Sequence, residues 1–332
     1  MTTILVTGGA GYIGSHTCKL LAGTGRLPVA FDDLSNGHAD AVRWGPLEVG
    51  SIEDRRRLRE VIQAWHPEAA IHFAGLIEVG RSVEDPAAFY RTNVAGSLAL
   101  LEEMGAAGVR RIVFSSSASV YGVPPASPVS EDAPPAPVSP YGETKRAVEA
   151  MLDAFARARG TRHMALRYFN AAGADPEGEL GERHDPETHL VPRALRAALG
   201  LEPHIAIFGT DYPTPDGTAV RDYVHVSDLA AAHVAALDCL AGGGGPATVN
   251  IGAGRGHSVR QVLDAVRRIT GRPFAERPAP RRTGDPPELV AATGRAARLL
   301  GWTPRLSDLD RIVATAWAWH ARHDAPAGPA EA

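Results

Sequence analysis

A glycine-rich turn near the N-terminus constrains the fold of this chain more than any other feature. The residues T-G-G-A-G-Y-I-G run from Thr7 to Gly14, directly after the short apolar stretch Thr3–Thr7 and directly before a segment with helical spacing. Three glycines, Gly8, Gly11 and Gly14, form a G-x-x-G-x-x-G pattern that lets backbone approach a pyrophosphate at a helix N-terminus. The order strand, turn, helix therefore predicts a dinucleotide-binding unit.

The end of the second apolar stretch indicates which dinucleotide is bound. L-P-V-A-F-D ends at Asp32, which is 18 residues after Gly14. A carboxylate at this place can accept hydrogen bonds from the hydroxyls of an adenosine ribose. Asp32 and Asp33 together would repel a 2′-phosphate, so we expect NAD rather than NADP.

The first 170 residues alternate short apolar stretches with stretches of helical spacing. After Asp32 the apolar stretches are 69–73, 111–116 and 163–168, and the helical ones, from the start of the chain, are 11–22, 53–65, 87–106 and 141–159. Such repeated alternation predicts an α/β fold, a Rossmann-type doubly wound parallel sheet with right-handed crossovers.

The later part of the chain has a less regular pattern with longer loops, which suits substrate recognition. We therefore expect an NAD-binding Rossmann domain at 1–170, joined by returning segments of the later chain. A smaller C-terminal α/β substrate domain is expected at 171–320, and a flexible tail at 321–332.

Composition limits the classes of function. A formal charge of −4, with 44% hydrophobic and 22% charged residues, predicts a sizeable core and argues against a nucleic-acid partner. We find no run of about 18 apolar residues and no basic stretch before the first apolar one, so we expect neither a membrane partner nor a secretory signal. Cys18 and Cys239 make neither a disulfide framework nor a metal cluster. We expect a cytoplasmic protein without a metal site.

Two further motifs carry candidate catalytic residues. S-S-S-A-S-V-Y-G (Ser115–Gly122) follows a predicted strand, and S-P-Y-G-E-T-K begins at Ser139, a candidate helix cap. Tyr141 and Lys145 then share one helix face because they are four residues apart. Lys145 is one of only two lysines beside 32 arginines, which indicates a specific need for a compact ammonium. The other lysine, Lys19, is expected at the surface.

This pair can supply a base. A free tyrosine has a pKa near 10 and is a poor base at neutral pH, but a neighbouring ammonium and the positive nicotinamide of NAD⁺ favour the phenolate. Lowering its pKa by about three units corresponds to roughly 4 kcal/mol of differential interaction. The alternative is an exposed tyrosine and a solvated lysine without catalytic roles.

The glycine turn, the serine-rich strand end and Y-x-x-x-K resemble the motifs of extended short-chain dehydrogenase/reductases that act on nucleotide sugars. Other motifs narrow the resemblance, the most specific being A-I-F-G-T-D-Y-P-T-P-D-G-T-A-V-R-D-Y-V-H-V from Ala206 to Val226. The others are H-F-A-G (72–75), T-N-V-A-G (92–96), F-S-S-S-A-S-V-Y-G (114–122), R-Y-F-N (167–170) and N-I-G-A-G (250–254). Together they resemble the UDP-glucose 4-epimerase family over nearly the whole chain.

The resemblance implies an NAD-dependent interconversion of UDP-glucose and UDP-galactose. Tyr141 would take the proton of the sugar 4-hydroxyl while C4 gives a hydride to NAD⁺, and the 4-keto sugar would turn and be reduced on its other face. Lys145 would tune that tyrosine and hold the nicotinamide ribose, and Ser117 would bond to O4. Members of the family are usually homodimers.

The resemblance also implies two sets of binding residues. The NAD contacts would be Gly8, Gly11, Tyr12, Ile13, Gly14, Asp32, Asp33, Leu34, Ser35, Asn36, Ser51, Ile52, Phe73, Ala74, Gly75, Leu76, Asn93, Ser115, Tyr141, Lys145 and Phe169. The UDP-sugar contacts would be Ser117, Tyr141, Asn170, His189, Leu190, Ala206, Ile207, Phe208, Arg221, Arg282, Asp285 and Leu289. Of these, the two arginines suit a diphosphate.

Four positions depart from the pattern of some members. Ile77 replaces a lysine near the nicotinamide, Ser51 replaces an aspartate near the adenine, and His189 replaces an asparagine beside the sugar. Leu289 stands where a bulky tyrosine closes the pocket beside the sugar 2-substituent, so an N-acetyl group could fit here.

Other activities therefore stay open. Dual use of UDP-N-acetylglucosamine and a UDP-pentose 4-epimerase are the nearer alternatives, and a non-catalytic NAD-binding sensor is a remote one. A 4,6-dehydratase would need an acid–base carboxylate pair after the serine-rich strand, and the segment S-S-A-S from Ser116 to Ser119 offers none.

Overall fold

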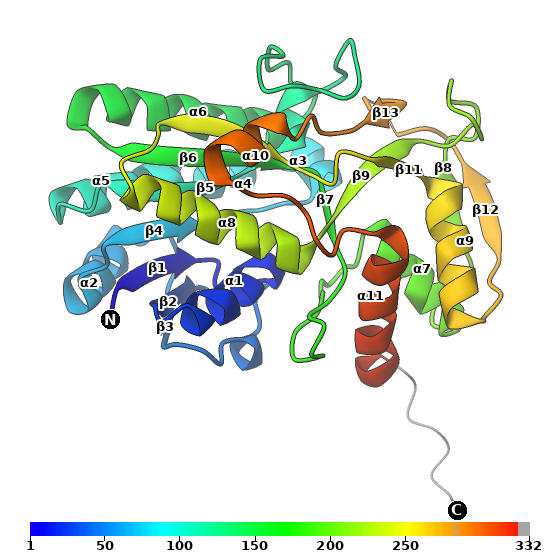
Figure 1. Ribbon diagram of the computed structural model, residues 1–332, viewed down its shortest axis with the longest axis horizontal. Helices are drawn as coiled ribbons and strands as arrows, with labels where there is room; N and C mark the ends of the chain where they lie inside the picture. Colours follow the sequence, from blue (N-terminus) through cyan, green and yellow to red (C-terminus); the bar gives the residue numbers. More distant parts are fainter. Residues whose placement is uncertain (283, 325–332) are drawn as a thin grey trace, which may run out of the picture.

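The computed structural model describes residues 1–282 and 284–324, and its main feature is a seven-stranded parallel sheet (Figure 1). The strand order is β10-β6-β5-β4-β1-β2-β3, with every neighbouring pair parallel. The strands are β1 (Thr3–Thr7), β2 (Leu27–Asp32), β3 (Leu47–Val49), β4 (Ala69–His72), β5 (Arg111–Ser117), β6 (Arg162–Tyr168) and β10 (Ala247–Ile251). The predicted doubly wound sheet is confirmed, whereas the short edge strand β3 is absent from the prediction.

Helices cover both faces of this sheet, which explains the continuous apolar strands. Within β1, Ile4 and Val6 pack on the face covered by α1 (Tyr12–Gly23) and α8 (Val226–Ala241). Leu5 points to the opposite face, into the core beneath three other helices. Those helices are α2 (Arg55–Trp65), α5 (Ser97–Ala106) and α6 (Pro140–Arg159).

The segment expected as one helix over 87–106 is instead broken into pieces. Beside α3 (Val79–Glu84), α4 (Pro86–Phe89) leads into the π-helical segment η2 (Tyr90–Gly96), and α5 follows. Pro86 supplies a natural first helical residue, and Asp85 caps it by accepting from the Ala88 N–H at 3.2 Å. Widened helical turns of this kind are frequent at functional sites.

A second group of elements lies beside the main sheet. One small sheet has the order β11-β9-β13 with β7 also paired to β9, and another pairs β8 with β12. The strands are β7 (Asn170–Ala172), β8 (Ile205–Phe208), β9 (Val220–His225), β11 (Gly256–Ser258), β12 (Glu276–Ala279) and β13 (Glu288–Leu289). The helices are α7 (Leu190–Ala198), α9 (Val259–Thr270) and α11 (Leu309–His323), which share one apolar core.

The chain crosses between the two groups more than once. After β9 it returns to the main sheet through α8 and β10, and later through α10 (Gly294–Leu300), which packs on both. β7 follows directly after β6 and lies near the ends of β5 and β6, whereas β8 lies further out beside β12, as Figure 1 shows. This arrangement places the second group beside the carboxyl ends of the central strands.

The prediction of a flexible tail at 321–332 is wrong for its first residues. α11 continues to His323 because Trp319 and His320 are buried in its last turns, and Nδ1 of His320 lies 2.7 Å from Oδ2 of Asp324. Residues 325–332 lie outside the described part of the chain.

Candidate active site

The glycine turn between β1 and α1 is built so that two of its glycines cannot be replaced without rearrangement. Gly8 has φ +72°, and a Cβ there would lie 2.6 Å from the Ala74 nitrogen. A Cβ on Gly14 would lie 2.1 Å from the Gly8 carbonyl oxygen. Both glycines therefore let the turn pack against itself and against the segment after β4.

Gly11 differs from its neighbours because the protein leaves room at this position. A Cβ there would meet only the Gly8 oxygen, at 3.3 Å. Gly11 is the N-cap of α1, a helix described in full, in which no side chain bonds to the cap and no acidic residue occupies the first turn. The bare N–H groups at this helix start suit a phosphate, and the turn thus fits the pyrophosphate of a dinucleotide.

Asp32 is fixed against this turn. Its Oδ2 accepts from the Ala10 N–H at 3.0 Å and its Oδ1 accepts from the Leu34 N–H at 2.9 Å. Burial raises the pKa of Asp32, while these hydrogen bonds act against that rise. Asp33 instead holds Ser35, whose N–H and hydroxyl both donate to its Oδ1. The carboxylate at the end of β2 therefore lies where a ribose would follow the pyrophosphate.

The segment after β4 is held by the π-helical turn. Oδ1 of the buried Asn93 accepts from the Leu76 N–H at 2.8 Å, and its Nδ2 donates to the Leu76 oxygen at 3.0 Å. The same Nδ2 donates to the Thr144 hydroxyl on α6 at 3.1 Å. Asn93 thus ties Phe73–Leu76 to the helix that carries Tyr141. Ser51, which is expected to contact adenine, accepts from the Glu53 N–H at 3.2 Å.

The three candidate catalytic residues come together at the carboxyl end of β5. α6 begins as predicted, with Ser139 accepting from the Gly142 N–H at 3.2 Å and Pro140 in the first turn. Lys145 is buried, and its Nζ donates to the Ser115 oxygen at 2.9 Å and lies 5.7 Å from the Tyr141 ring centre.

The pKa shifts of Tyr141 and Lys145 differ from those expected from the sequence. Burial is the largest influence on Tyr141 and raises its pKa above the ordinary value, although a hydrogen bond with Ser117 acts in the opposite direction. Burial also lowers the pKa of Lys145 to about 8. The neighbouring ammonium therefore does not by itself produce a phenolate, because both groups are removed from water. A bound nicotinamide would add a further positive charge that favours the phenolate.

The structure places a buried carboxylate near Lys145 that the sequence analysis does not include in the site. Glu149 lies one helical turn further along α6, and its Oε1 accepts from the Ser116 hydroxyl at 2.6 Å. Arg167 on β6 donates to both of its oxygens, at 2.9 and 2.6 Å. The negative charge of Glu149 raises the pKa of Lys145, against the effect of burial. The spacing of four residues between Lys145 and Glu149 is the signal that could have revealed it.

Tyr168, at the end of β6, also reaches the site. Its hydroxyl lies 2.6 Å from the Ser115 hydroxyl, and its charge, if ionised, would raise the pKa of Tyr141. Tyr168 is therefore part of the hydrogen-bonded surroundings of the serine-rich strand end.

The candidate substrate residues lie in the second group of elements. On β9, Arg221 pairs with Asp285 and also donates to the Pro286 oxygen at 2.8 Å. The Arg282 guanidinium lies 4.2 Å from the Phe208 ring centre at the end of β8. These contacts bring the β8 strand and the residues after β12 to one place.

Two other expected substrate residues border the catalytic side. Leu289 pairs in register with Arg221 and packs against the cluster that contains Phe169 and Tyr121. Asn170 begins β7 directly after Phe169. Leu289 therefore lies where the second group of elements meets the residues at the end of β6.

His189 and Leu190 mark the start of α7, with His189 as its N-cap. Nδ1 of His189 lies 2.9 Å from Glu182 and 3.0 Å from Glu187. The imidazole of His189 thus makes polar contacts with two carboxylates.

Lys19, which is expected at the surface, is partly exposed and forms three ion pairs. Its Nζ lies 2.8 Å from Asp175, 2.6 Å from Glu177 and 2.6 Å from Glu179, and its side chain is only 19% exposed. These ion pairs join α1 to the loop after β7, so Lys19 links the two groups of elements.

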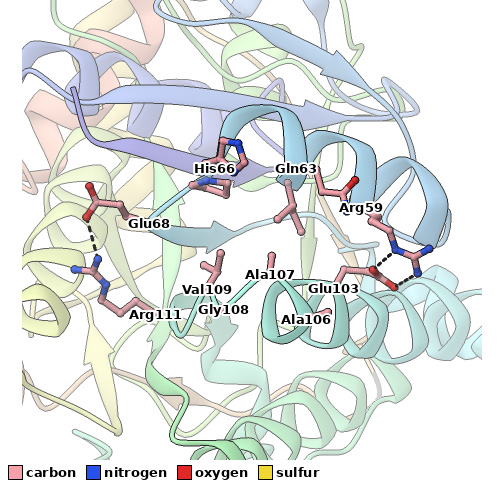
Figure 2. Close-up of a pocket in the computed structure, with 12 residues that line it drawn as sticks. Arg59, Gln63, His66, Glu68, Glu103, Ala106, Ala107, Gly108, Val109 and Arg111 are labelled. Carbon is pink, nitrogen blue, oxygen red and sulfur yellow. Dashed lines mark hydrogen bonds and ion pairs between the residues drawn. The ribbon is translucent and has the colours of Figure 1, made fainter.

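A pocket of about 540 Å³ lies away from this site, between α2 and α5 (Figure 2). Arg59 pairs with Glu103 at one side of it, and Arg111 pairs with Glu68 at the other. Glu68 and Arg111 lie at the amino ends of β4 and β5, whereas ligands of open parallel sheets bind beyond the carboxyl ends. The glycine turn and Tyr141 therefore define the candidate active site.

Comparisons with known proteins agree with this geometry. The chain matches the model of the NAD dependent epimerase/dehydratase family over residues 4–252. It is 52% identical to a UDP-glucose 4-epimerase of Rhizobium meliloti, over 97% of this chain and 98% of that protein.

Solved structures give the same result. A UDP-glucose 4-epimerase from Brucella ovis in complex with NAD has a TM-score of 0.93 and 51% identity, over 96% of this chain and 98% of that one. A UDP-glucose-4-epimerase from Stenotrophomonas maltophila with bound NAD and formylated UDP-arabinopyranose has a TM-score of 0.94 and 40% identity, over 98% of this chain and 99% of that one. The resemblance derived from the motifs is thereby confirmed, and the chain belongs to the NAD dependent epimerase/dehydratase family, within its UDP-glucose 4-epimerases.

Proposed function

We propose that this enzyme interconverts UDP-glucose and UDP-galactose by oxidation at C4, rotation of the 4-keto sugar and reduction on its other face. The observation that carries the proposal is the convergence of Tyr141, Lys145 and Ser117 beyond β5, next to a glycine turn that fits a dinucleotide. Full-length similarity to UDP-glucose 4-epimerases supports the same reaction.

NAD, when bound, supplies a reversible hydride acceptor at the nicotinamide. The chain supplies the proton chemistry, because the Tyr141 hydroxyl can exchange a proton with the sugar 4-hydroxyl while the Ser117 hydroxyl holds that oxygen. Lys145 provides a buried positive charge that favours the ionised tyrosine. Burial raises the pKa of Tyr141, so a positive charge close to its hydroxyl would favour the ionised base.

The substrate residues divide by chemistry. Arg221 and Arg282 would hold the diphosphate, with Asp285 keeping Arg221 oriented toward it. Ala206, Ile207 and Phe208 would form the edge beside the nucleoside. Since the sugar must turn between two faces, we expect binding energy to be concentrated on the UDP part and to be small on the hexose.

A second candidate activity follows from Leu289. Its side chain is smaller than tyrosine and lies beside Phe169 in the cluster next to the site. An N-acetyl group at the sugar 2-position could occupy the space left, so use of UDP-N-acetylglucosamine is the nearest alternative. A UDP-pentose is a further one, because a solved relative binds a formylated UDP-arabinopyranose.

A turnover assay tests these activities together. Purified protein is incubated, without added NAD, with UDP-galactose and with UDP-N-acetylgalactosamine in parallel reactions. Conversion of UDP-galactose alone would mean a strict enzyme with tightly held cofactor, and conversion of both would mean an open pocket at Leu289. If NAD is bound but neither sugar is converted, UDP-pentoses are assayed next, and a negative result there would favour a non-catalytic sensor.

We also propose that the chain forms a homodimer. Large apolar side chains are exposed along α3, η2 and α5, among them Val83 (65% exposed), Val79 (46%), Tyr90 (46%) and Leu98 (37%). A second copy would cover this surface, and sedimentation equilibrium would give a molecular mass of one chain if the proposal is wrong.

A cytoplasmic location is proposed from the chemistry of the cysteines. Cys18 and Cys239 are both free thiols, the usual state in a reducing compartment. Among the described residues, moreover, we find no helix whose length and apolar character would let it cross a lipid bilayer.

A further inference from the structure

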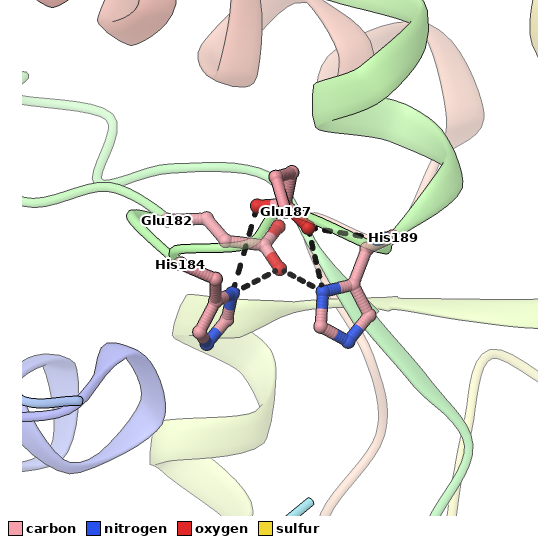
Figure 3. A group of neighbouring side chains, drawn as sticks. All are labelled: Glu182, His184, Glu187 and His189. Carbon is pink, nitrogen blue, oxygen red and sulfur yellow. Dashed lines mark hydrogen bonds and ion pairs between the residues drawn. The ribbon is translucent and has the colours of Figure 1, made fainter. Parts of the chain in front are cut away.

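Four ionisable side chains converge in the loop between β7 and α7 (Figure 3), and one of them, His189, is also among the expected UDP-sugar contacts. Glu182, His184, Glu187 and His189 each offer one ligand atom, and these atoms all lie within 4.8 Å of one another. The two carboxylates are almost fully buried, with side-chain exposures of 4% for Glu182 and 6% for Glu187. Figure 3 shows both imidazoles directing Nδ1 toward the carboxylates and Nε2 away from them.

The nitrogen–oxygen separations are close to those between neighbouring ligands of a tetrahedral metal ion. Nδ1 of His184 lies 3.2 Å from Oε1 of Glu182 and 3.6 Å from Oε2 of Glu187. Nδ1 of His189 lies 2.9 Å from Oε1 of Glu182 and is hydrogen-bonded to the other oxygen of Glu187, Oε1, at 3.0 Å. Ligands that lie about 2.0–2.1 Å from a zinc ion at tetrahedral angles are about 3.3 Å apart. We propose that these four side chains form a binding site for a divalent transition-metal ion, with zinc as the preferred occupant.

The donor set favours this class of ion. Two imidazole nitrogens with two carboxylate oxygens suit zinc and neighbouring transition metals, whereas magnesium and calcium prefer oxygen ligands alone. The Nδ1 atom of His184 is inaccessible to water and makes no hydrogen bond of good geometry within the described part of the chain. This nitrogen is therefore buried, and its described polar neighbours are the two carboxylates, of which Glu182 is the nearer at 3.2 Å.

Charge balance is consistent with a divalent ion. Two imidazolium protons and one divalent ion carry the same charge, so either neutralises the two carboxylates. The ion-pair network is accordingly the competing interpretation of the same geometry.

A metal ion here would hold the loop between β7 and α7 beside the helix that follows the glycine turn. The His184 ring lies 6.3 Å from the ring of Tyr12, whose hydroxyl donates to the Gly173 oxygen at 2.6 Å. His189 caps α7, and Leu190 follows it. The proposed role is thus structural, since the ion would fix the loop from Gly173 to Leu190 and with it the orientation of His189. This departs from the expectation of a chain without a metal site.

Zinc binding to untagged protein tests the proposal. The protein is treated with a chelator and titrated with zinc chloride by calorimetry, and wild type is expected to bind one zinc per chain with a rise in melting temperature. His184→Gln and Glu187→Gln should weaken that binding by at least about tenfold. Circular dichroism establishes that both variants are folded.

A matched control comes from the neighbouring acidic group. Asp175, Glu177 and Glu179 also lie close together, but they surround the Lys19 ammonium. Glu177→Gln should therefore leave zinc binding unchanged. Absence of zinc binding by wild type, or binding that both His184→Gln and Glu187→Gln retain, would overturn the proposal in favour of a closed ion-pair network.

X-ray absorption at the zinc edge provides a test that needs no variant. Wild-type protein loaded with one equivalent of zinc should show nitrogen and oxygen neighbours, with two imidazole rings. A sulfur neighbour would locate the metal at a cysteine, and more than two imidazoles or none would locate it at other residues. Either result would refute the proposed site.

Discussion

Replacing Glu149 by glutamine tests whether the buried pair below the catalytic lysine matters for stability and for activity. The substitution keeps the shape of the side chain and removes its charge. Arg167, only 5% exposed, would then keep its positive charge without a counter-ion, while the glutamine oxygen could still accept one of its hydrogen bonds.

The expected loss of stability follows from the burial of both partners. Removing one member of a buried ion pair typically costs about 3–5 kcal/mol, because the remaining charge stays away from water. In a chain of this length each kcal/mol lowers the melting temperature by about 2 °C, so we expect Glu149→Gln to melt about 6–10 °C below wild type.

The same substitution should change the pH profile of turnover. Burial lowers the pKa of Lys145 to about 8, and the negative charge of Glu149 opposes that effect. Without this charge the pKa of Lys145 falls further. If the ammonium form is the active one, the fall of activity at alkaline pH then begins at a lower pH than in wild type.

The control is Glu143→Gln, at the exposed start of the same helix, where the carboxylate lies 3.6 Å from Arg146. Thermal melts and turnover across the neutral and alkaline range are compared for wild type and both variants. If Glu149→Gln melts within about 1 °C of Glu143→Gln, the buried pair does not carry the stability assigned to it. An unchanged alkaline limb would remove Glu149 as an influence on Lys145.

Three other predictions concern the site itself. Tyr141→Phe should lower kcat by about 10²–10⁴ while the protein keeps its fold and its NAD content, and near-normal turnover would show that another group is the base. Leu289→Tyr should reduce conversion of UDP-N-acetylgalactosamine more than that of UDP-galactose, and equal losses would exclude Leu289 as the gate. Gly14→Ala should lower the melting temperature and abolish NAD retention because its Cβ would lie 2.1 Å from the Gly8 oxygen, whereas Gly11→Ala, with 3.3 Å at its nearest contact, should stay folded and bind NAD more weakly. NAD retained after gel filtration and thermal melts distinguish the last two.

Local signals in the sequence were sufficient for much of the fold and for the centre of the candidate site. β1 and β2 have the bounds that their apolar runs predict, since strands buried on both faces need continuous apolar residues. The turn at Gly8 and the helix start at Ser139 follow from the conformations that glycine and serine favour. The shared face of Tyr141 and Lys145 follows from helical periodicity alone.

Long-range packing decided the features that the sequence did not reveal. From the π-helical turn, Asn93 bonds to the backbone of Leu76, 17 residues away, and Lys19 is paired with carboxylates more than 150 residues away. Such pairings leave no local period in the sequence.

The electrostatic character of the site was likewise decided by the tertiary structure. The sequence by itself determined that a tyrosine and a lysine share a helix face with a serine-rich strand end nearby. Only the folded chain buries Tyr141 and Lys145 together and places Glu149 and Arg167 beneath them. The physical reason is that a pKa depends on how much water and which charges surround a group, and both are set by elements that are distant in the sequence.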